Sequence, residues 1–365
     1  MAISNRLRKL KNILPFIIMW FVGGVLYIVI ERGMMGDYQV YPSTGNPYDF
    51  ESSFVVIAIS SAFIGFLQGL AEVTWLKNFM KAYAFGTKML VKILLYVLLL
   101  FIFLVITSFP LNSHALGLPL FHPEVIDAIW LYMSNFVFWS VMLYAATFIG
   151  LGLFISELMQ NLGSNVVINF FTGRYHSSKV EDRVFMFLDM KSSTTIAEKL
   201  GHEVYYQLLN AYYEDMTEAI FNTRGEVYQY VGDEIVVSWP SDKGIQSNNC
   251  LRCFFLIREE IAKHAPKYKE RFGLVPEFKA GLHIGKVTTG EVGVLKKEIL
   301  FTGDAINTTA RIQSLCNEQK TDLLLSKDLI SALKLDGSFT TEQRGKFALR
   351  GRDQQIELLT IHQIS

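Results

Sequence analysis

Cysteine is scarce in this 365-residue sequence, which has only 3, all in its C-terminal half: Cys250, Cys253 and Cys316. Disulfide frameworks belong to oxidising compartments, so this small number favours free thiols in a reducing one. Cys250 and Cys253 have the spacing of a metal-binding pair, but a single pair cannot complete a tetrahedral zinc site. Because the surrounding NNCLRCFFLIREEI has the pattern of an amphipathic helix, we interpret it as a buried helix. Zinc or redox chemistry is the alternative.

Net charge is absent as well, because 34 Lys and Arg residues balance 34 Asp and Glu residues. Beyond a short N-terminal segment, the sequence has no basic run of the kind that binds nucleic acid. Nucleic acid is therefore not expected as a partner. Any charged small-molecule substrate must be bound by the local geometry of a site.

Charged residues are missing from four long apolar stretches, residues 13–30, 54–71, 93–109 and 128–155. The chain is 51% hydrophobic with a mean hydropathy of +0.28, which is high for a purely soluble protein. Each stretch is long enough to cross a bilayer as a helix. We therefore expect an all-α, four-helix transmembrane region over residues 1–156. The absence of ionisable residues from these spans disfavours a transporter or a channel.

The first apolar stretch has no clear small-residue cleavage site and precedes three more, so we expect a membrane helix and not a cleaved signal peptide. Loops rich in Lys and Arg stay in the cytoplasm. Here these residues lie mainly before the first stretch and between the second and third: Arg6, Arg8, Lys9, Lys11, Lys77, Lys81 and Lys88. We therefore expect a multi-pass protein of the cell (inner) membrane, with the bilayer as a partner and both termini in the cytoplasm.

The segment that follows the membrane region, residues 157–182, is amphipathic. Apolar residues such as Leu158, Leu162 and Val166 recur in it at helical spacing. We expect a connector helix there, which either pairs with a partner helix or lies on the membrane surface or on its own domain.

From residue 183 to residue 365, predicted strands and helices alternate. VFMFLDM predicts a strand, and the apolar spacing in residues 204–220 predicts an amphipathic helix. EVYQYV and EIVVSW predict a hairpin with the two-residue turn Gly232-Asp233. The order βαββαβ predicts an α+β domain, with an antiparallel or mixed sheet covered by helices on one face.

Three polar segments stand out within this half of the chain. Asp189 ends the strand of FMFLDMKSSTT, and Asp233 occupies the turn of YQYVGDEIVVSW. We expect their carboxylates to converge at one edge of the sheet. In FTGDAINTTARIQ, Asn307 and Arg311 stand four residues apart on a predicted helix, so they share one helical face.

Together these segments resemble class III nucleotide cyclases, the adenylate and guanylate cyclases, over residues 184–357 and in the family's order and spacing. The resemblance implies a ferredoxin-like βαββαβ catalytic domain over residues 183–365, of the bacterial membrane-anchored type. It also implies conversion of ATP into 3′,5′-cyclic AMP and pyrophosphate, in signal transduction. The GG[DE]EF signature of diguanylate cyclases is absent, since VGDEI lacks the paired glycines and the phenylalanine.

The resemblance assigns Asp189, Asp233 and the backbone carbonyl of Met190 to two Mg²⁺ or Mn²⁺ ions per active site. Attack of the ribose 3′-hydroxyl on the α-phosphorus requires one ion to acidify the hydroxyl and another to neutralise the triphosphate. Mg²⁺ prefers oxygen ligands and takes several from substrate phosphates, which suits a site with only two carboxylates. Ordinary turn and cap aspartates are the alternative.

The resemblance also implies transition-state roles, in which Asn307 orients the ribose and Arg311 stabilises charge on the leaving pyrophosphate. A surface arginine on an amphipathic helix is the alternative. Phosphate binding is expected from basic residues and from backbone amides at a helix start. The candidates are Lys286, Arg352 with Arg350 as its rival, and Ser192, Ser193 and Thr194.

The two positions that read the purine depart from the family pattern. Adenylate cyclases typically carry Lys and Asp there and guanylate cyclases Glu and Cys, whereas this sequence has Gln229 and Leu300. Because Leu neither donates nor accepts a hydrogen bond, at most one of these side chains reads the base edge. We expect ATP as the main substrate with measurable use of GTP. A guanylate cyclase or a mixed ATP/GTP cyclase is the alternative.

In this family each active site forms at a dimer interface, with metals held by one subunit and the Asn and Arg supplied by the other. This chain carries both halves, so the resemblance implies a homodimer with two equivalent sites. Paired connector helices would then let the membrane region regulate catalysis. A non-catalytic nucleotide-binding membrane sensor is the second alternative, which the presence of both halves disfavours.

Overall fold

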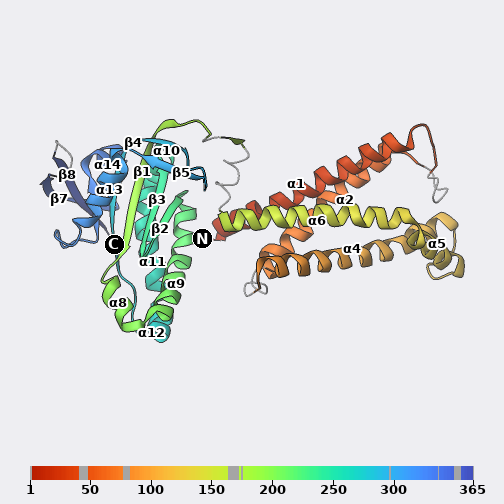
Figure 1. Ribbon diagram of the computed structural model, residues 1–365, viewed down its shortest axis with the longest axis horizontal. Coiled ribbons are helices and arrows are strands. Elements are labelled where there is room, and N and C mark those ends of the chain that lie inside the picture. Colours follow the sequence, from red (N-terminus) through yellow and green to blue (C-terminus); the bar gives the residue numbers. More distant parts are fainter. Residues whose placement is uncertain are drawn as a thin grey trace. The chain divides into compact units, whose positions relative to one another are not determined.

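The computed structural model describes residues 2–40, 48–76, 83–162, 172–173, 176–295, 297–335, 337–348 and 355–364. The chain divides into two compact units, Met1–Thr172 and Gly173–Ser365, which are coloured red to yellow and green to blue in Figure 1. The first unit is helical, and the described strands all belong to the second.

Among its described residues, the helical unit has four segments that are long and apolar enough to cross a membrane. The described helices are α1 (Ala2–Met35), α2 (Phe50–Ala71), the π-helical turn η1 (Glu72–Leu76), α4 (Phe85–Leu116), α5 (Pro123–Ser134) and α6 (Phe136–Leu162). The four segments are Asn12–Met35, Phe50–Thr74, Phe85–His114 and Phe136–Met159. The expected number of apolar helices is therefore confirmed.

The fourth segment starts later than the expected residue 128, because α5 and α6 are separate helices. Asn135 between them has an extended backbone, and its side-chain oxygen Oδ1 accepts a hydrogen bond from the backbone N–H of Val137 at 3.0 Å. Such a local side-chain bond satisfies a free amide at a helix start and competes with helix continuation. Asn135 therefore separates two helices within the apolar stretch that was expected to form one.

Polar side chains do occur inside these helices, which corrects the expectation that the spans lack ionisable residues. Lys92 of α4 and Glu72 of η1 form an ion pair of 2.5 Å, with side chains 3% and 4% exposed. Tyr96 also donates to Glu72, and Trp20 of α1 donates to Gln68 of α2 at 2.6 Å. The absence of buried charge therefore no longer argues against a transport function.

The second unit is built on a mixed eight-stranded sheet. Its order begins β2-β3-β1-β4, and β1 is antiparallel to both of its neighbours, β3 and β4. Together with the chain order β1-α9-β2-β3-α11-β4, this is the expected ferredoxin-like βαββαβ arrangement. The sheet continues through β6, which is parallel to β4, to β8 and β7, while β5 pairs with β4.

The strands are β1 (Lys179–Met190), β2 (Glu226–Val231), β3 (Glu234–Pro240), β4 (Phe278–Val292), β5 (Glu298–Thr302), β6 (Leu323–Ser326), β7 (Phe339–Phe347) and β8 (Ile356–Gln363). The helices are α8 (Ser193–Leu200), α9 (His202–Asn222), α10 (Ser241–Ile245), the 3₁₀ turn η2 (Gln246–Asn248), α11 (Asn249–Lys263), α12 (Ala265–Phe272), α13 (Asp304–Ser314) and α14 (Lys327–Ala332).

Helices cover both faces of the sheet, not one face as expected. Alternate residues of β1, such as Met186 and Leu188, pack with α9 and α11 in the main core. The opposite face carries Phe185 and Phe187, which lie in a second cluster with Ala305 of α13. Figure 1 shows α9 and α11 on one side of the strands and α13 on the other.

The three cysteines are buried and free, and the burial of Cys250 and Cys253 agrees with the predicted amphipathic helix. Cys250 and Cys253 lie on the buried side of α11 within the main core. Burial raises the pKa of each thiol to about 12, so both are neutral at physiological pH. They fill the core and have neither the charge nor the accessibility of metal ligands.

The expected connector overlaps both neighbouring elements. Its first residues, 157–162, continue α6, and its last, 179–182, belong to β1. The expected boundary at residue 182 therefore lies inside a strand. Residues 163–171, on which most of the predicted stripe falls, lie outside the described residues.

Candidate functional site

Asp189 and Asp233 come together at the edge of the sheet. Asp189 is the second-last residue of β1, and its partner across to β3 is Glu234, which directly follows Asp233. The pKa of Asp233 is raised, first by burial and then by its hydrogen bond to the carboxyl group of Asp189. The predicted convergence of the two carboxylates is confirmed.

The turn that carries Asp233 has the predicted geometry. Gly232 has a φ of 64°, a left-handed conformation that glycine adopts without the steric cost of a Cβ atom. Tyr213 of α9 donates a hydrogen bond to the carbonyl of Gly232 at 2.8 Å and so ties the turn to the helix beneath it. The position of Asp233 is therefore fixed by the hairpin and by α9 together.

The donor set fits a divalent cation. Oδ2 of Asp233 is buried and has no hydrogen-bond partner among the described residues. The pKa of Glu234 is raised to about 7, by burial first and then by the negative charges of Asp189 and Asp233. A cation bound between the aspartates would satisfy this oxygen and offset this repulsion. In the described part of the chain no group of three or more His, Cys, Asp or Glu side chains could hold a metal, so a cation here would need further oxygen ligands besides these carboxylates.

Two residues that the sequence did not single out contact Asp189. Lys279 of β4 is directly opposite Asp189 in the sheet, and its Nζ lies 3.4 Å from Oδ2. Gln313 of α13 donates through Nε2 to the same oxygen at 3.1 Å. Lys279 could have been noticed as a lysine inside the apolar strand EFKAGLHIG. Nothing in the sequence pointed to Gln313.

The remaining residues near the carboxylates lie around the start of α8. Ser193 is hydrogen bonded to Asp233, which lowers the pKa of that carboxyl and opposes the effect of burial. Ser192 precedes the helix in a left-handed conformation, and Ser192 and Thr194 are exposed. Met190, the last residue of β1, is buried. This helix start therefore lies beside the two aspartates.

Asn307 and Arg311 lie on the outer face of α13. Asn307 is exposed and Arg311 is partly exposed, whereas Ala305, Thr309 and Ile312 are buried against the sheet. Successive helix residues are about 100° apart, so Asn307 and Arg311 are only about 40° apart and face away from the buried side. Within one chain they face away from the sheet that carries Asp189.

The two purine-reading candidates lie next to a direct contact between β2 and β5. The hydroxyl of Tyr228 accepts a hydrogen bond from the backbone N–H of Phe301 at 3.4 Å, and the two rings are 4.8 Å apart. Gln229 and Leu300, the neighbours of these residues in sequence, are both exposed. The fold therefore brings the two segments side by side.

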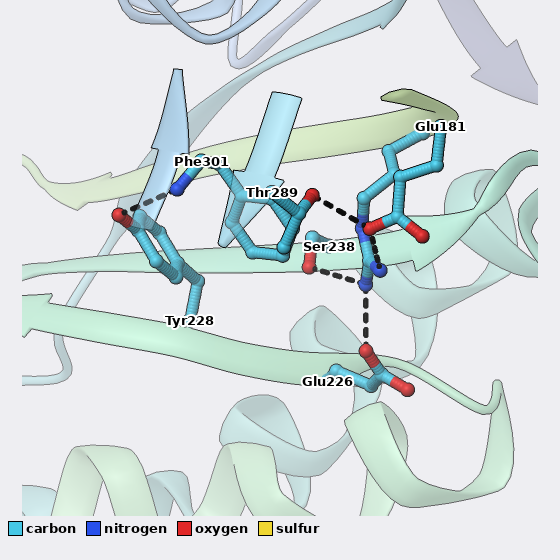
Figure 2. A network of polar contacts seen from close by, with 7 residues as sticks. Glu181, Glu226, Tyr228, Ser238, Thr289 and Phe301 are labelled. Carbon is cyan, nitrogen blue, oxygen red and sulfur yellow. Dashed lines mark hydrogen bonds and ion pairs between the residues drawn. The ribbon is translucent and has the colours of Figure 1, made fainter. Parts of the chain in front are cut away.

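A buried arginine, which the sequence did not single out either, holds together the strands around the contact between β2 and β5 (Figure 2). Arg183 of β1 is 1% exposed and bonds Glu226 of β2 at 2.6 Å and Ser238 of β3 at 3.0 Å. Its guanidinium lies over the ring of Phe301, 4.6 Å from the centroid. It also pairs with Glu181, which accepts a hydrogen bond from Thr289 of β4. This one side chain therefore links β1 directly to β2, β3 and β5, and Glu181 extends the network to β4.

Of the basic phosphate-binding candidates, Lys286 does not lie beside the aspartates within one chain. Lys286 of β4 is exposed and lies opposite Asp182, seven residues along the strand from Lys279, the partner of Asp189. Seven residues of a strand span about 23 Å, and the odd interval puts the side chains of Lys286 and Lys279 on opposite faces. Arg350 and Arg352 lie outside the described residues.

Comparisons with known proteins identify the family of this domain. Residues 176–363 match the family described as "Adenylate and Guanylate cyclase catalytic domain". "Adenylate cyclase 2" of Rhizobium meliloti is 33% identical over 222 residues, which are 61% of each chain. The "Adenylate cyclase" of Anabaena cylindrica is 24% identical over 48% of this chain and 36% of its own. This chain thus spans less than two thirds of the length of either relative.

A solved structure shares the fold. "Structure of a bacterial light-regulated adenylyl cyclase" superposes with a TM-score of 0.52 at 21% identity, over 62% of this chain and 65% of that one. The family match covers slightly more than half of the chain, from just before β1 to the end of β8. The chain therefore belongs to the family of adenylate and guanylate cyclases.

Proposed function

We propose that this chain is a membrane-bound adenylate cyclase, which converts ATP into 3′,5′-cyclic AMP and pyrophosphate. The observation that carries the proposal is the convergence of Asp189 and Asp233 at one sheet edge, where one carboxylate oxygen of Asp233 has no hydrogen-bond partner in the described part of the chain. The names of the two bacterial relatives, both adenylate cyclases, support ATP as the substrate.

In this reaction a bond forms between the ribose 3′-oxygen and the α-phosphorus. The bond between that phosphorus and the oxygen bridging to the β-phosphate breaks, pyrophosphate leaves, and the hydroxyl proton passes to water. Bound Mg²⁺ or Mn²⁺ would acidify the hydroxyl and neutralise the triphosphate. Asp189 and Asp233, with the carbonyl of Met190, would hold these ions.

The other site residues bind and orient the nucleotide. The helix start at Ser192, Ser193 and Thr194 offers backbone amides to the triphosphate. Arg311 would stabilise the pyrophosphate as its charge grows, while Asn307 orients the ribose. Because these two side chains face away from their own sheet, we assign them to the site of a second chain in a homodimer. Lys286 and Arg352, or Arg350, are assigned to the phosphates of that shared site.

The four apolar helices support a location in the cell membrane. The basic residues that flank them support an orientation with the N-terminus and the cyclase unit in the cytoplasm, where ATP is available. The membrane region would then act in signal transduction by changing how the two cyclase units face each other.

The test is a side-by-side assay of the full chain in lipid bilayer discs with Mn²⁺ and either ATP or GTP. Products are separated by chromatography. We expect cyclic AMP and pyrophosphate in equal amounts from ATP and a smaller yield of cyclic GMP from GTP. Faster use of GTP would identify a guanylate cyclase, and no turnover of either nucleotide would favour a nucleotide-binding sensor.

A further inference from the structure

Helix α13 presents different chemistry on its two sides. Asn307 and Arg311 lie on its outer side, while Gln313 is 6% exposed and lies about 160° around the helix from Arg311. A glutamine on the buried side of a helix needs a hydrogen-bond partner, because burying an unpaired amide costs free energy. Gln313 finds that partner in Asp189, one of the two proposed metal ligands, at 3.1 Å.

The approach of α13 to the sheet makes this bond possible. A Cβ atom at Gly281 of β4 would lie 2.4 Å from the backbone nitrogen of Gln313, and one at Gly285 would lie 2.8 Å from Cβ of Ala305. These glycines are four residues apart, so they lie on the same face of the strand. With no side chains at either position, the helix lies close against β4, and Gln313 reaches the neighbouring strand β1.

Both additional contacts of Asp189 involve the same carboxylate oxygen. Gln313 and Lys279 are 3.1 Å and 3.4 Å from Oδ2, and neither contact uses Oδ1. A carboxylate held through one oxygen cannot rotate freely about its Cβ–Cγ bond, so the direction of its other oxygen is also fixed. Hydrogen bonds of this kind orient metal ligands, and their loss typically costs about 10- to 100-fold in metal affinity or activity.

We infer that Gln313 is a positioning residue of the metal site: it holds Oδ2 of Asp189 and thereby leaves Oδ1 directed toward a divalent cation. The inference rests on the proposed function, since it deepens the role of the same site. The competing role for Gln313 is structural, in which it only keeps α13 in place and so positions Asn307 and Arg311. The two roles affect different subunits of the proposed homodimer.

An experiment with two different chains separates these roles. One full-length chain carries N307A and R311A and keeps the aspartates, and the other carries D189N and D233N and keeps Asn307 and Arg311. The chains bear different affinity tags, so the heterodimer is purified by both tags in succession and placed in bilayer discs. It contains one complete site, whose aspartates and whose Asn–Arg pair come from different chains.

The substitution Gln313→Met keeps the side-chain length and removes the amide donor. In the chain that keeps the aspartates, we expect it to raise the Mn²⁺ concentration for half-maximal cyclic AMP formation about tenfold or more. In the other chain we expect less than about a twofold change, because Gln313 has no metal-binding Asp189 to position there. Ser314→Ala, on the exposed side of the same helix, is the matched control.

Metal binding is also measured without turnover. The electron paramagnetic resonance signal of free Mn²⁺ reports how much of the ion is bound in the presence of 3′-deoxy-ATP, which lacks the attacking hydroxyl. We expect Gln313→Met to weaken Mn²⁺ binding by the same factor as in the activity assay. An unchanged binding curve would overturn the inference.

The remaining outcomes are equally decisive. An equal effect of Gln313→Met in both chains, or an effect only in the chain that supplies Asn307 and Arg311, would show a structural role. If the heterodimer is inactive while the wild-type chain is active, the two-chain site is wrong, and the Mn²⁺ dependence of the Gln313→Met homodimer tests the positioning role. If the wild-type chain forms no cyclic nucleotide, the proposed function itself fails.

Discussion

Asp189 of β1 and Glu234 of β3 are direct cross-strand partners, so their side chains leave the sheet on the same face. Asp233 precedes Glu234 in the chain, and three carboxyl groups therefore share one sheet edge. Burial, followed by the charges of Asp189 and Asp233, raises the pKa of Glu234 from 4.5 to about 7, with Lys279 acting in the opposite direction. This crowding of negative charge has consequences for stability and for metal binding.

The first prediction concerns pH. Because the pKa of Glu234 is higher in the folded chain, the folded state holds more protons than the unfolded state between pH 4.5 and about 7. The contribution of this group to stability is full below that window and is lost as the pH rises through it. In metal-free thermal unfolding, the melting temperature of Glu234→Gln should fall less than that of the wild type as the pH rises through this range.

Exposed Glu203 of α9 supplies the control, since Glu203→Gln should keep the wild-type slope. Mn²⁺ should raise the melting temperature more at pH 8 than at pH 5, because metal ligands must be deprotonated. Identical pH slopes for Glu234→Gln and the wild type would contradict the proposed crowding.

The second prediction concerns Ser193. Burial raises the pKa of Asp233, the hydrogen bond to Asp189 adds to this, and the hydrogen bond to Ser193 lowers it. Ser193→Ala removes the opposing contact, so the carboxyl should ionise at a higher pH. The acidic limb of the Mn²⁺-dependent activity profile should shift upward in pH, whereas exposed Thr194→Ala should leave it in place. A shift to lower pH, or none, would be inconsistent with this contact.

The third prediction concerns the base. Gln229 and Leu300 are exposed beside the contact between Tyr228 and Phe301, so changes there should be tolerated by the fold. The pair Q229K and L300D introduces a donor and an acceptor, and hydrogen bonds discriminate more strongly than apolar contact. The ratio of kcat/KM for ATP to that for GTP should rise at least about tenfold. The pair Q229E and L300C should lower it, and an unchanged ratio in both would remove these positions from base recognition.

The fourth prediction concerns Arg183, whose guanidinium contacts residues of β1, β2, β3 and β5. Arg183→Met leaves Glu226 and Glu181 without this cationic partner. The two carboxylate side chains are 30% and 23% exposed to solvent, respectively. We expect a loss of about 3 kcal/mol in the unfolding free energy, toward the lower end for a broken buried pair. Hydrogen exchange of the β1 amides in the full chain would measure this loss in unfolding free energy. Arg252→Ala on the exposed side of α11 should change it by less than about 0.5 kcal/mol.

The parts of the site that could be predicted are those that depend on local sequence. Asp233 lies in a two-residue hairpin turn, and the glycine beside it is a turn signal that can be recognised in the local sequence. The faces of α13 likewise follow from residue spacing, so the shared orientation of Asn307 and Arg311 was predictable. The four apolar helices were predictable because each stretch is long and apolar enough to indicate a membrane-spanning helix without information from the rest of the chain.

The parts that could not be predicted depend on strand register and on helix placement. Lys279 contacts Asp189 only because β4 pairs with β1 in one particular register, and a one-residue slip would turn the lysine to the other face. Gln313 depends on the close packing of α13 over Gly281, on a face expected to lack helices. The buried pair of Glu72 and Lys92 was missed because each residue adjoins the end of an apolar stretch.

In the function that we propose, Asp189 and Asp233 hold the metal ions of a cyclase. The most direct measurement is cyclic AMP formation by the full chain in bilayers over a range of Mn²⁺ concentrations, for the wild type, Asp189→Asn and Asp182→Asn. Asp182 is an exposed aspartate of the same strand and serves as the matched control. We expect Asp182→Asn to follow the wild-type curve, while Asp189→Asn shows only the rate seen without Mn²⁺. A wild-type Mn²⁺ dependence for Asp189→Asn would rule out metal binding by this residue.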